Sequence, residues 1–165
     1  DQRILSPAIA TIEKDGRYDD YPMASQMYTV LLAEHDRLQG KPQAAVERLK
    51  TVVADDESLI LAHSSLLRAH RDSGNDPAVL QQAEWLLRHR GRAFVERSTG
   101  GLLDPLVVAD TTLARLDAAD ALRKLDRHAN ADSQLSAFHS QWPGKELPEP
   151  IRSRADKLAA PHAVR

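Results

Sequence analysis

Residues 29–87 decide the fold of this chain, and they read TVLLAEHDRLQGKPQAAVERLKTVVADDESLILAHSSLLRAHRDSGNDPAVLQQAEWLL. Two glycines in this stretch, Gly40 and Gly74, lie 34 residues apart. Other positions match at the same offset: Leu32 with Leu66, Arg37 with Arg71, Val46 with Leu80, Val52 with Leu86 and Val53 with Leu87. A period of this length, with apolar residues at helical spacing on both sides of a glycine turn, is typical of an array of helical hairpins. We therefore expect an all-α fold in which successive helix pairs form an α-α superhelix.

The composition excludes several classes of protein. The 165 residues are one domain's worth of chain, and 42% hydrophobic with 28% charged residues is ordinary for a globular protein. Only 4% of the residues are aromatic, which argues against a β-sandwich and against a base-stacking surface for nucleic acid. The net charge of −2 provides no bulk attraction to nucleic acid or to anionic lipid. The chain has no cysteine and no apolar run long enough to span a membrane.

The start of the chain also bears on its origin. It begins at Asp1 and carries no signal peptide. We expect a domain excised from a larger bacterial protein, with a cytoplasmic location favoured. A periplasmic location is the alternative if a leader has been removed.

Helix start and stop signals divide the chain into consecutive units. Ser6 and Pro7 suggest the start of a short N-terminal helix that ends at Asp15-Gly16, and residues 22–38 form a long helix. Asp76 before Pro77 suggests an N-cap, as does Asp104 at the start of a long helix over residues 104–126. We expect one domain over residues 1–165, with repeat 1 at 22–56, repeat 2 at 57–90, a connector at 91–103, repeat 3 at 104–143 and a capping helix at 148–160.

The connector is rich in arginine and glycine, and we expect it to be partly helical from Gly91 to Arg97. Its basic cluster could hold a phosphate or an acidic partner. Arginines at the C-terminal end of a helix are also stabilised by the helix dipole without any ligand, and we favour this explanation. The cluster consists of Arg88, Arg90, Arg92 and Arg97.

The repeated units resemble tetratricopeptide repeats. That family has a large apolar residue followed by a small one in the first helix, as in Leu32-Ala33 and in part Ala118-Ala119. The family has a glycine at the turn, which Gly40 and Gly74 match and Asp126 replaces in the third unit. It has a small residue early in the second helix, which Ala45 and Ala131 match and Val79 replaces in the second unit. It also has a proline at the end of the unit, which Pro143 matches. The resemblance covers about two thirds of the chain and implies a superhelix that binds proteins or peptides.

The last third of the chain is similar to a narrower group, the repeat regions at the C-terminal ends of multidomain bacterial regulators. The similarity rests on Leu113-Ala114-Arg115, then Ala131, Leu135, Phe138 and Trp142, followed by a proline-rich exit into a short helix. In those proteins the repeats typically follow a winged-helix, kinase or nucleotidyl-cyclase module. The resemblance therefore implies a regulatory tail.

No residue pattern in the sequence points to catalysis or to a cofactor. His63 and His70 lie two helical turns apart, roughly 10 Å, with only leucine between them on that face, so we do not expect them to share a metal ion. Asp19 and Asp20 lack the glycine and the distal glutamate of a calcium loop. The glycines are scattered, so neither a phosphate-binding loop nor a Gly-x-Ser-x-Gly nucleophile elbow is present. We expect no enzyme activity, no cofactor and no metal.

In this architecture the first helix of each pair lines the concave side. The residues then expected on that side are Met27, Val30, Glu34 and Arg37 from the first pair, Leu61, Ser64, Arg68 and Arg71 from the second, and Leu113, Asp120, Arg123 and Lys124 from the third. The five cations are candidate ligand-binding residues: Arg37, Arg68, Arg71, Arg123 and Lys124. Such a groove favours an acidic peptide or a C-terminal carboxylate, unless these side chains are solvated arginines on helix flanks.

We therefore expect a non-catalytic scaffold or regulatory module that binds a protein or peptide, with an acidic partner favoured. One alternative is the sensory tail of a signalling enzyme, such as a cyclase or kinase, or of a transcription regulator. A second alternative is a self-association module that forms homo-oligomers, because repeats without end caps can stack end to end.

Overall fold

The protein was analysed as a computed structural model that describes residues 2–16, 21–54, 59–94, 104–142 and 147–160. The described part is mainly helical and contains no strand. In chain order the helices are α1 (Gln2–Asp15), α2 (Pro22–Leu38), α3 (Pro42–Val52), α4 (Ile60–Asp72), α5 (Asp76–Arg88), the 3-10 helix η2 (Arg90–Phe94), α6 (Asp104–Lys124), α7 (His128–Gln141) and α8 (Glu149–Ala159). The predicted all-α fold is confirmed.

Three of the turns between helices have the same backbone geometry. Gly40, Gly74 and Asp126 each have a positive φ, at 75°, 71° and 58°. In each case the next residue's N–H donates to the carbonyl five residues earlier: Lys41 to Asp36, Asn75 to His70 and Arg127 to Leu122, at 3.0, 3.0 and 2.8 Å. This pattern satisfies the free carbonyls at a helix end. The turns therefore lie at Gly40, Gly74 and Asp126, as predicted from the sequence.

Two predicted helix starts are wrong. α1 begins at Gln2 rather than after Ser6, so Pro7 lies inside the helix. Pro7 itself is exposed, and it removes one backbone hydrogen-bond donor from the helix. The N-cap of α5 is Asn75, not Asp76, because the Asn75 side chain accepts a hydrogen bond from the Ala78 N–H at 3.3 Å.

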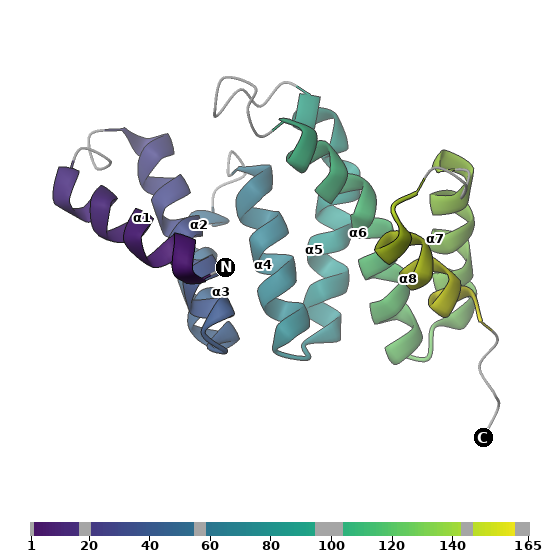
Figure 1. The fold of residues 1–165 in the computed structure, drawn as a ribbon. Coiled ribbons are helices and arrows are strands. Elements are labelled where there is room, and N and C mark those ends of the chain that lie inside the picture. The colour runs from purple at the N-terminus through teal and green to yellow at the C-terminus, as the bar shows by residue number, and fades with distance from the viewer. Residues whose placement is uncertain (1, 17–20, 55–58, 95–103, 143–146, 161–165) are drawn as a thin grey trace.

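The helices from α2 to α7 form a row in which each packs on the next (Figure 1). In addition, α2 contacts α4 and α4 contacts α6, so these three helices share one side of the row. We call α2, α4 and α6 the inner helices. Their arrangement brings residues that are tens of positions apart in the sequence onto one surface.

Two hydrophobic clusters stabilise this row, and α4 contributes to both. The cluster around α2 and α3 includes the fully buried Leu49 and takes Leu66 from α4. The cluster that spans α5 to α8 includes the fully buried Phe138 and takes Leu67 from the same helix. Burial on several sides agrees with the sequence, in which apolar residues occupy two faces of this helix.

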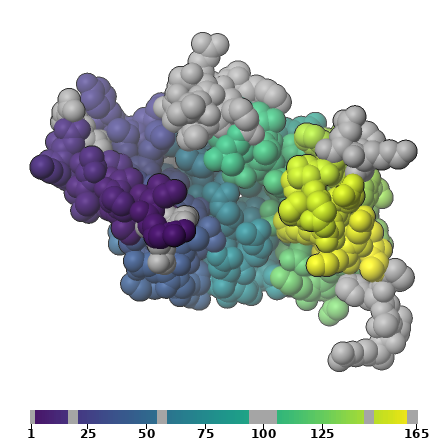
Figure 2. Space-filling view, viewed as in Figure 1, coloured from purple at the N-terminus to yellow at the C-terminus, as the bar shows by residue number. Residues whose placement is uncertain are grey.

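The two end helices cover parts of this row. α1 packs on α2, and α8 packs on α6 and α7 at the opposite end (Figures 1 and 2). Ala155 of α8 is buried, and Ile151 and Leu158 pack against the larger cluster. The described residues include no helix long and apolar enough to cross a membrane.

The described part of the connector, residues 91–94, is helical. η2 ends at Phe94, and Ala93 is buried against α6. The rest of the predicted connector, residues 95–103, and the closing Pro143 lie outside the described residues.

Candidate binding groove on the inner helices

An open groove of about 820 Å³ lies between α1 and the inner helices. Its wall is mainly apolar and includes Met27, Leu31 and Leu61. The lining residues are Leu5, Ile12 and Asp15 of α1; Tyr21; Ala24, Met27, Tyr28, Val30, Leu31 and Glu34 of α2; Leu61, Ser65 and Arg68 of α4; and Leu106 of α6. We call this surface the apolar groove.

The lining includes five residues that the sequence places on the inner side: Met27, Val30, Glu34, Leu61 and Arg68. The contribution of α1 was not predicted. Tyr28 Oη donates to Glu13 Oε1 at 2.8 Å, and Ser6 Oγ lies 3.0 Å from His35 Nε2, so polar contacts hold α1 against α2. The apolar spacing of Ile9 and Ile12 indicates that α1 has a buried face, but it does not indicate where that helix docks.

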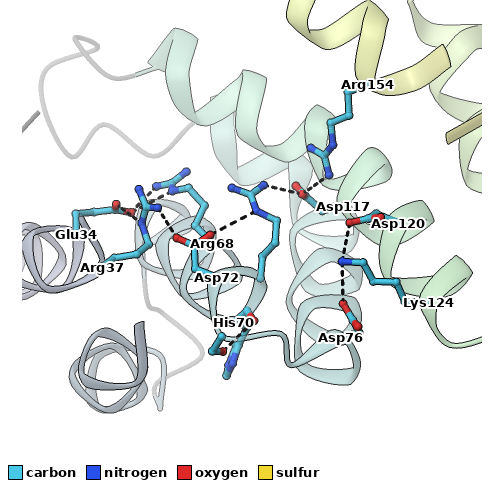
Figure 3. Close-up of polar contacts among 12 residues, drawn as sticks. Glu34, Arg37, Arg68, His70, Asp72, Asp76, Asp117, Asp120, Lys124 and Arg154 are labelled. Carbon is cyan, nitrogen blue, oxygen red and sulfur yellow. Dashed lines mark hydrogen bonds and ion pairs between the residues drawn. The ribbon is translucent and has the colours of Figure 1, made fainter. Parts of the chain in front are cut away.

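Arg37 was predicted as a ligand-binding cation, and it lies at the junction of α2 and α4. Its Nε donates to Glu34 Oε2 at 2.8 Å, and its Nη1 donates to Asp72 Oδ2 at 2.6 Å (Figure 3). Burial alone would lower the pKa of Arg37, but hydrogen bonds and the charges of both carboxylates raise it above the ordinary value. The arginine therefore joins two helices.

Arg68 joins all three inner helices. From α4 it donates to Glu34 Oε1 on α2 and to Asp110 Oδ2 on α6, both at 3.0 Å. Burial alone would raise the pKa of Glu34, but Arg68 and Arg37 outweigh it and hold that pKa below its ordinary value. Glu34 and Arg68 are 34 residues apart, so they occupy equivalent positions of the sequence period.

Arg71 forms the next contact along the row. Its Nη1 donates to Asp117 Oδ1 at 3.0 Å, and Arg154 Nη2 from α8 donates to the same oxygen at 2.7 Å (Figure 3). The Asp117 side chain is 9% exposed, so two guanidinium groups compensate a buried carboxylate. This cluster connects α4, α6 and α8, and a smaller cavity of about 170 Å³ lies beside it.

The other two candidate cations lie near the far end of α6. Arg123 Nη2 donates to Asp132 Oδ1 of α7 at 2.7 Å. Lys124 Nζ lies 3.1 Å from Asp120 Oδ2 and 3.4 Å from Asp76 Oδ1 of α5 (Figure 3). Neither residue lines the apolar groove.

All five predicted cations therefore have a carboxylate of the same chain within 3.4 Å. An acidic ligand would have to displace these carboxylates or share the cations with them. The acidic partner stays a prediction, and the contacts assign the arginines of the inner helices a structural role.

Both histidines of α4, His63 and His70, are buried. His63 stacks on Trp85 of α5, with ring centroids 3.3 Å apart, and its Nδ1 lies 2.8 Å from Gln82 Oε1. Burial lowers the pKa of His63 to about 4, and the neighbouring His89 and Arg92 act in the same direction. Burial also lowers the pKa of His70. The part of the chain that the structure describes contains no group of three His, Cys, Asp or Glu that could hold a metal ion.

No family model matches this chain, and comparisons with curated proteins and with solved structures found no match either.

Proposed function

We propose that this chain is a non-catalytic scaffold of the tetratricopeptide type that binds a peptide segment of a partner protein in the apolar groove. The observation that carries this proposal is the groove itself, which is open, measures about 820 Å³ and lies on the inner helices. Peptide recognition by helical arrays uses extended surfaces of this kind. Three equivalent turns and the pairing of Glu34 with Arg68 across one sequence period support the repeat architecture.

The chemistry of the wall favours a ligand with apolar side chains. Two charged residues of its lining, Glu34 and Arg68, form an ion pair, and Arg37 and Asp110 also pair with them. A charged ligand gains little binding free energy from these four side chains, because their charges already compensate one another. Met27, Leu31 and Leu61 remain available for apolar contact, and methionine adapts to ligands of different shape. A peptide segment with two or three apolar side chains and little net charge fits this wall.

A selection of random peptides tests the proposal. We expect the chain to select peptides enriched in apolar side chains from a random 12-residue library displayed on phage. Fluorescence anisotropy with the selected peptides then compares two groove variants, Leu31→Gln and Leu61→Gln, with Leu38→Gln as a control. Leu38 lies on the same helix as Leu31 but outside the groove, and it is exposed. Circular dichroism of each variant checks that it is folded.

The expected result is a loss of affinity of about ten-fold or more in both groove variants, equivalent to at least about 1.4 kcal/mol, and none in the control. Equal binding by all variants would contradict the proposal. Selection of acidic peptides whose binding depends on Arg37 or Arg71 would also contradict it and would favour the acidic partner instead.

A further inference from the structure

The inner surface of the molecule has a second opening beside the apolar groove. It is a cavity of about 170 Å³ whose walls come from α4, α5, α6 and α8. Arg68 lines both the groove and this cavity, so the two are neighbours along α4. The cavity has five charged lining residues, and we call it the polar pocket: Arg68, Arg71, Asp110, Asp117 and Arg154.

The charged groups of the polar pocket are paired with one another. Arg68 Nη1 donates to Asp110 Oδ2 at 3.0 Å. Arg71 Nη1 and Arg154 Nη2 both donate to Asp117 Oδ1, at 3.0 and 2.7 Å (Figure 3). The side chains of Arg71 and Arg154 are 35% and 32% exposed, so a ligand can reach them from solvent. A guanidinium carries five N–H groups, so the bond to Asp117 uses only part of the donors of each arginine.

Three leucines add an apolar part to the same wall: Leu67 of α4, Leu86 of α5 and Leu113 of α6. Apolar contact and charged hydrogen-bonding groups are therefore available within one small volume. At about 170 Å³ the pocket is smaller than the roughly 300 Å³ at which small-molecule sites begin. Its size suits one side chain of a larger ligand.

A primary amide matches this lining better than a charged group does. The amide oxygen accepts hydrogen bonds from guanidinium groups, and the amide NH₂ donates to carboxylates. A carboxylate of the ligand would compete with Asp110 and Asp117 for the arginines, and an ammonium group would compete with the arginines for the two aspartates. Either would add an uncompensated charge to a set that is already paired. The methylene groups of a glutamine can also pack on the leucines.

The position of the polar pocket sets its distance from the apolar contacts. Leu61 lines the groove, and Arg71 lines the polar pocket about three turns later in α4. Three turns correspond to about 15 Å along the helix axis. An extended peptide covers this distance in about five residues. One peptide can therefore contact both openings.

We propose that the polar pocket binds a glutamine or asparagine side chain of the peptide that occupies the apolar groove. This inference rests on the proposed function and adds a requirement to the ligand, an amide within about five residues of its apolar side chains. Arg71 and Arg154 donate to the amide oxygen, and Asp110 or Asp117 accepts from the amide NH₂.

Selection from the random peptide library, repeated with two variants, tests this proposal. Arg154→Met removes one guanidinium of the pocket but leaves Asp117 paired with Arg71. Arg152→Met is the matched control, because Arg152 is an exposed arginine of the same helix that lies outside the pocket. Circular dichroism and the thermal midpoint of each variant check that the fold is retained.

A peptide series with the unaltered chain gives a second measurement, which does not depend on whether Arg154→Met folds. Fluorescence anisotropy compares a selected peptide that contains glutamine with copies in which methionine or glutamate replaces it. Methionine keeps the length of the side chain without its hydrogen bonds, and glutamate keeps the shape but adds a charge.

We expect the unaltered chain and Arg152→Met to select peptides with glutamine or asparagine within about five residues of the apolar side chains. Both replacements should weaken binding by about five-fold or more, because they leave buried polar groups without a partner or add a charge. Arg154→Met should lose the preference for an amide and still select apolar peptides.

Selection of apolar peptides without an enriched amide would overturn this inference and leave the proposed function standing. Equal affinity of the three peptides, tighter binding of the glutamate peptide, or an unchanged amide preference in folded Arg154→Met would also overturn it. A chain that selects no peptide at all would contradict both proposals.

Discussion

At the scale of single residues, Asp126 shows how the chain replaces glycine. It has the positive φ that Gly40 and Gly74 adopt in the two earlier turns, and its neighbours form the same hydrogen bond across the helix end. A side chain makes this conformation unfavourable, although aspartate tolerates it better than most residues. The third turn therefore keeps its geometry at an energetic cost that the other two avoid.

Asp126→Gly should consequently stabilise the protein. We expect an increase of about 1 kcal/mol in the free energy of unfolding, because glycine removes the strain at a positive φ. Urea unfolding followed by circular dichroism measures this change. Ala129→Gly is the control, since Ala129 lies in the first turn of α7 and is exposed, so glycine there relieves no strain and should not stabilise the protein. A destabilised Asp126→Gly variant would mean that the carboxylate contributes more than the backbone strain costs.

At the scale of helices, α4 is attached to its neighbours by arginines that sequence analysis assigned to ligand binding. Arg68 is 24% exposed and contacts Glu34 of α2 and Asp110 of α6, which are 18% and 14% exposed. Removal of one partner from such a cluster leaves the others with an unsatisfied charge, which costs more than loss of an exposed ion pair. Arg68 should therefore contribute to stability as a contact between helices.

Arg68→Met, which keeps much of the side-chain volume, should lower the free energy of unfolding by about 1–3 kcal/mol. The matched control is Lys50→Met, because Lys50 and Glu47 form a pair within one helix at 55% and 72% exposure. We expect the control to change stability by less than about 0.5 kcal/mol. Urea unfolding measures both variants. Equal effects would show that the contacts of Arg68 between helices add nothing beyond a surface ion pair.

At the scale of the whole molecule, the two hydrophobic clusters are joined through α4. That helix supplies buried leucines to both clusters and also carries two buried histidines, His63 and His70. Burial lowers the pKa of each histidine below its ordinary value, and the pKa of His63 falls to about 4. At a pH between the folded and the unfolded pKa, the folded state therefore keeps the histidines neutral while the unfolded chain binds protons. Acid should therefore weaken the helix on which both clusters depend.

The free energy of unfolding should fall as the pH decreases from 6.5 towards 4. Neutral His63 contributes its full stabilisation above the unfolded pKa of 6.5, and this contribution is lost as the pH falls from 6.5 towards the folded pKa of about 4. We expect a loss of about 2 kcal/mol from this residue, allowing for solvent screening. Urea unfolding between pH 7 and pH 4.5 measures the slope, and His63→Phe should flatten it while keeping a ring against Trp85. An identical slope in this variant would assign the acid sensitivity to other groups.

Much of the helical structure could be predicted from the sequence. The helix over residues 22–38 and the turns at Gly40, Gly74 and Asp126 depend on local patterns of proline, glycine and apolar residues, so a short stretch of chain is sufficient to determine them. The inner side of the first two pairs could be predicted in part, since Met27, Leu61 and Arg68 line the groove as expected. Self-association and a link to a signalling module stay predictions.

What the sequence determined by itself was the helical class, the turns and part of the inner side of the first two pairs, because these follow from periodicity and local backbone chemistry. Only the tertiary structure decided that α1 completes the apolar groove and that Arg71 meets Asp117, 46 positions away. Both contacts depend on packing between helices that are distant in the sequence. The stretch between the second and third helix pairs interrupts the sequence period, so no local pattern indicates how α6 is rotated against α4, and that rotation brings Asp110 to Arg68 and Asp117 to Arg71.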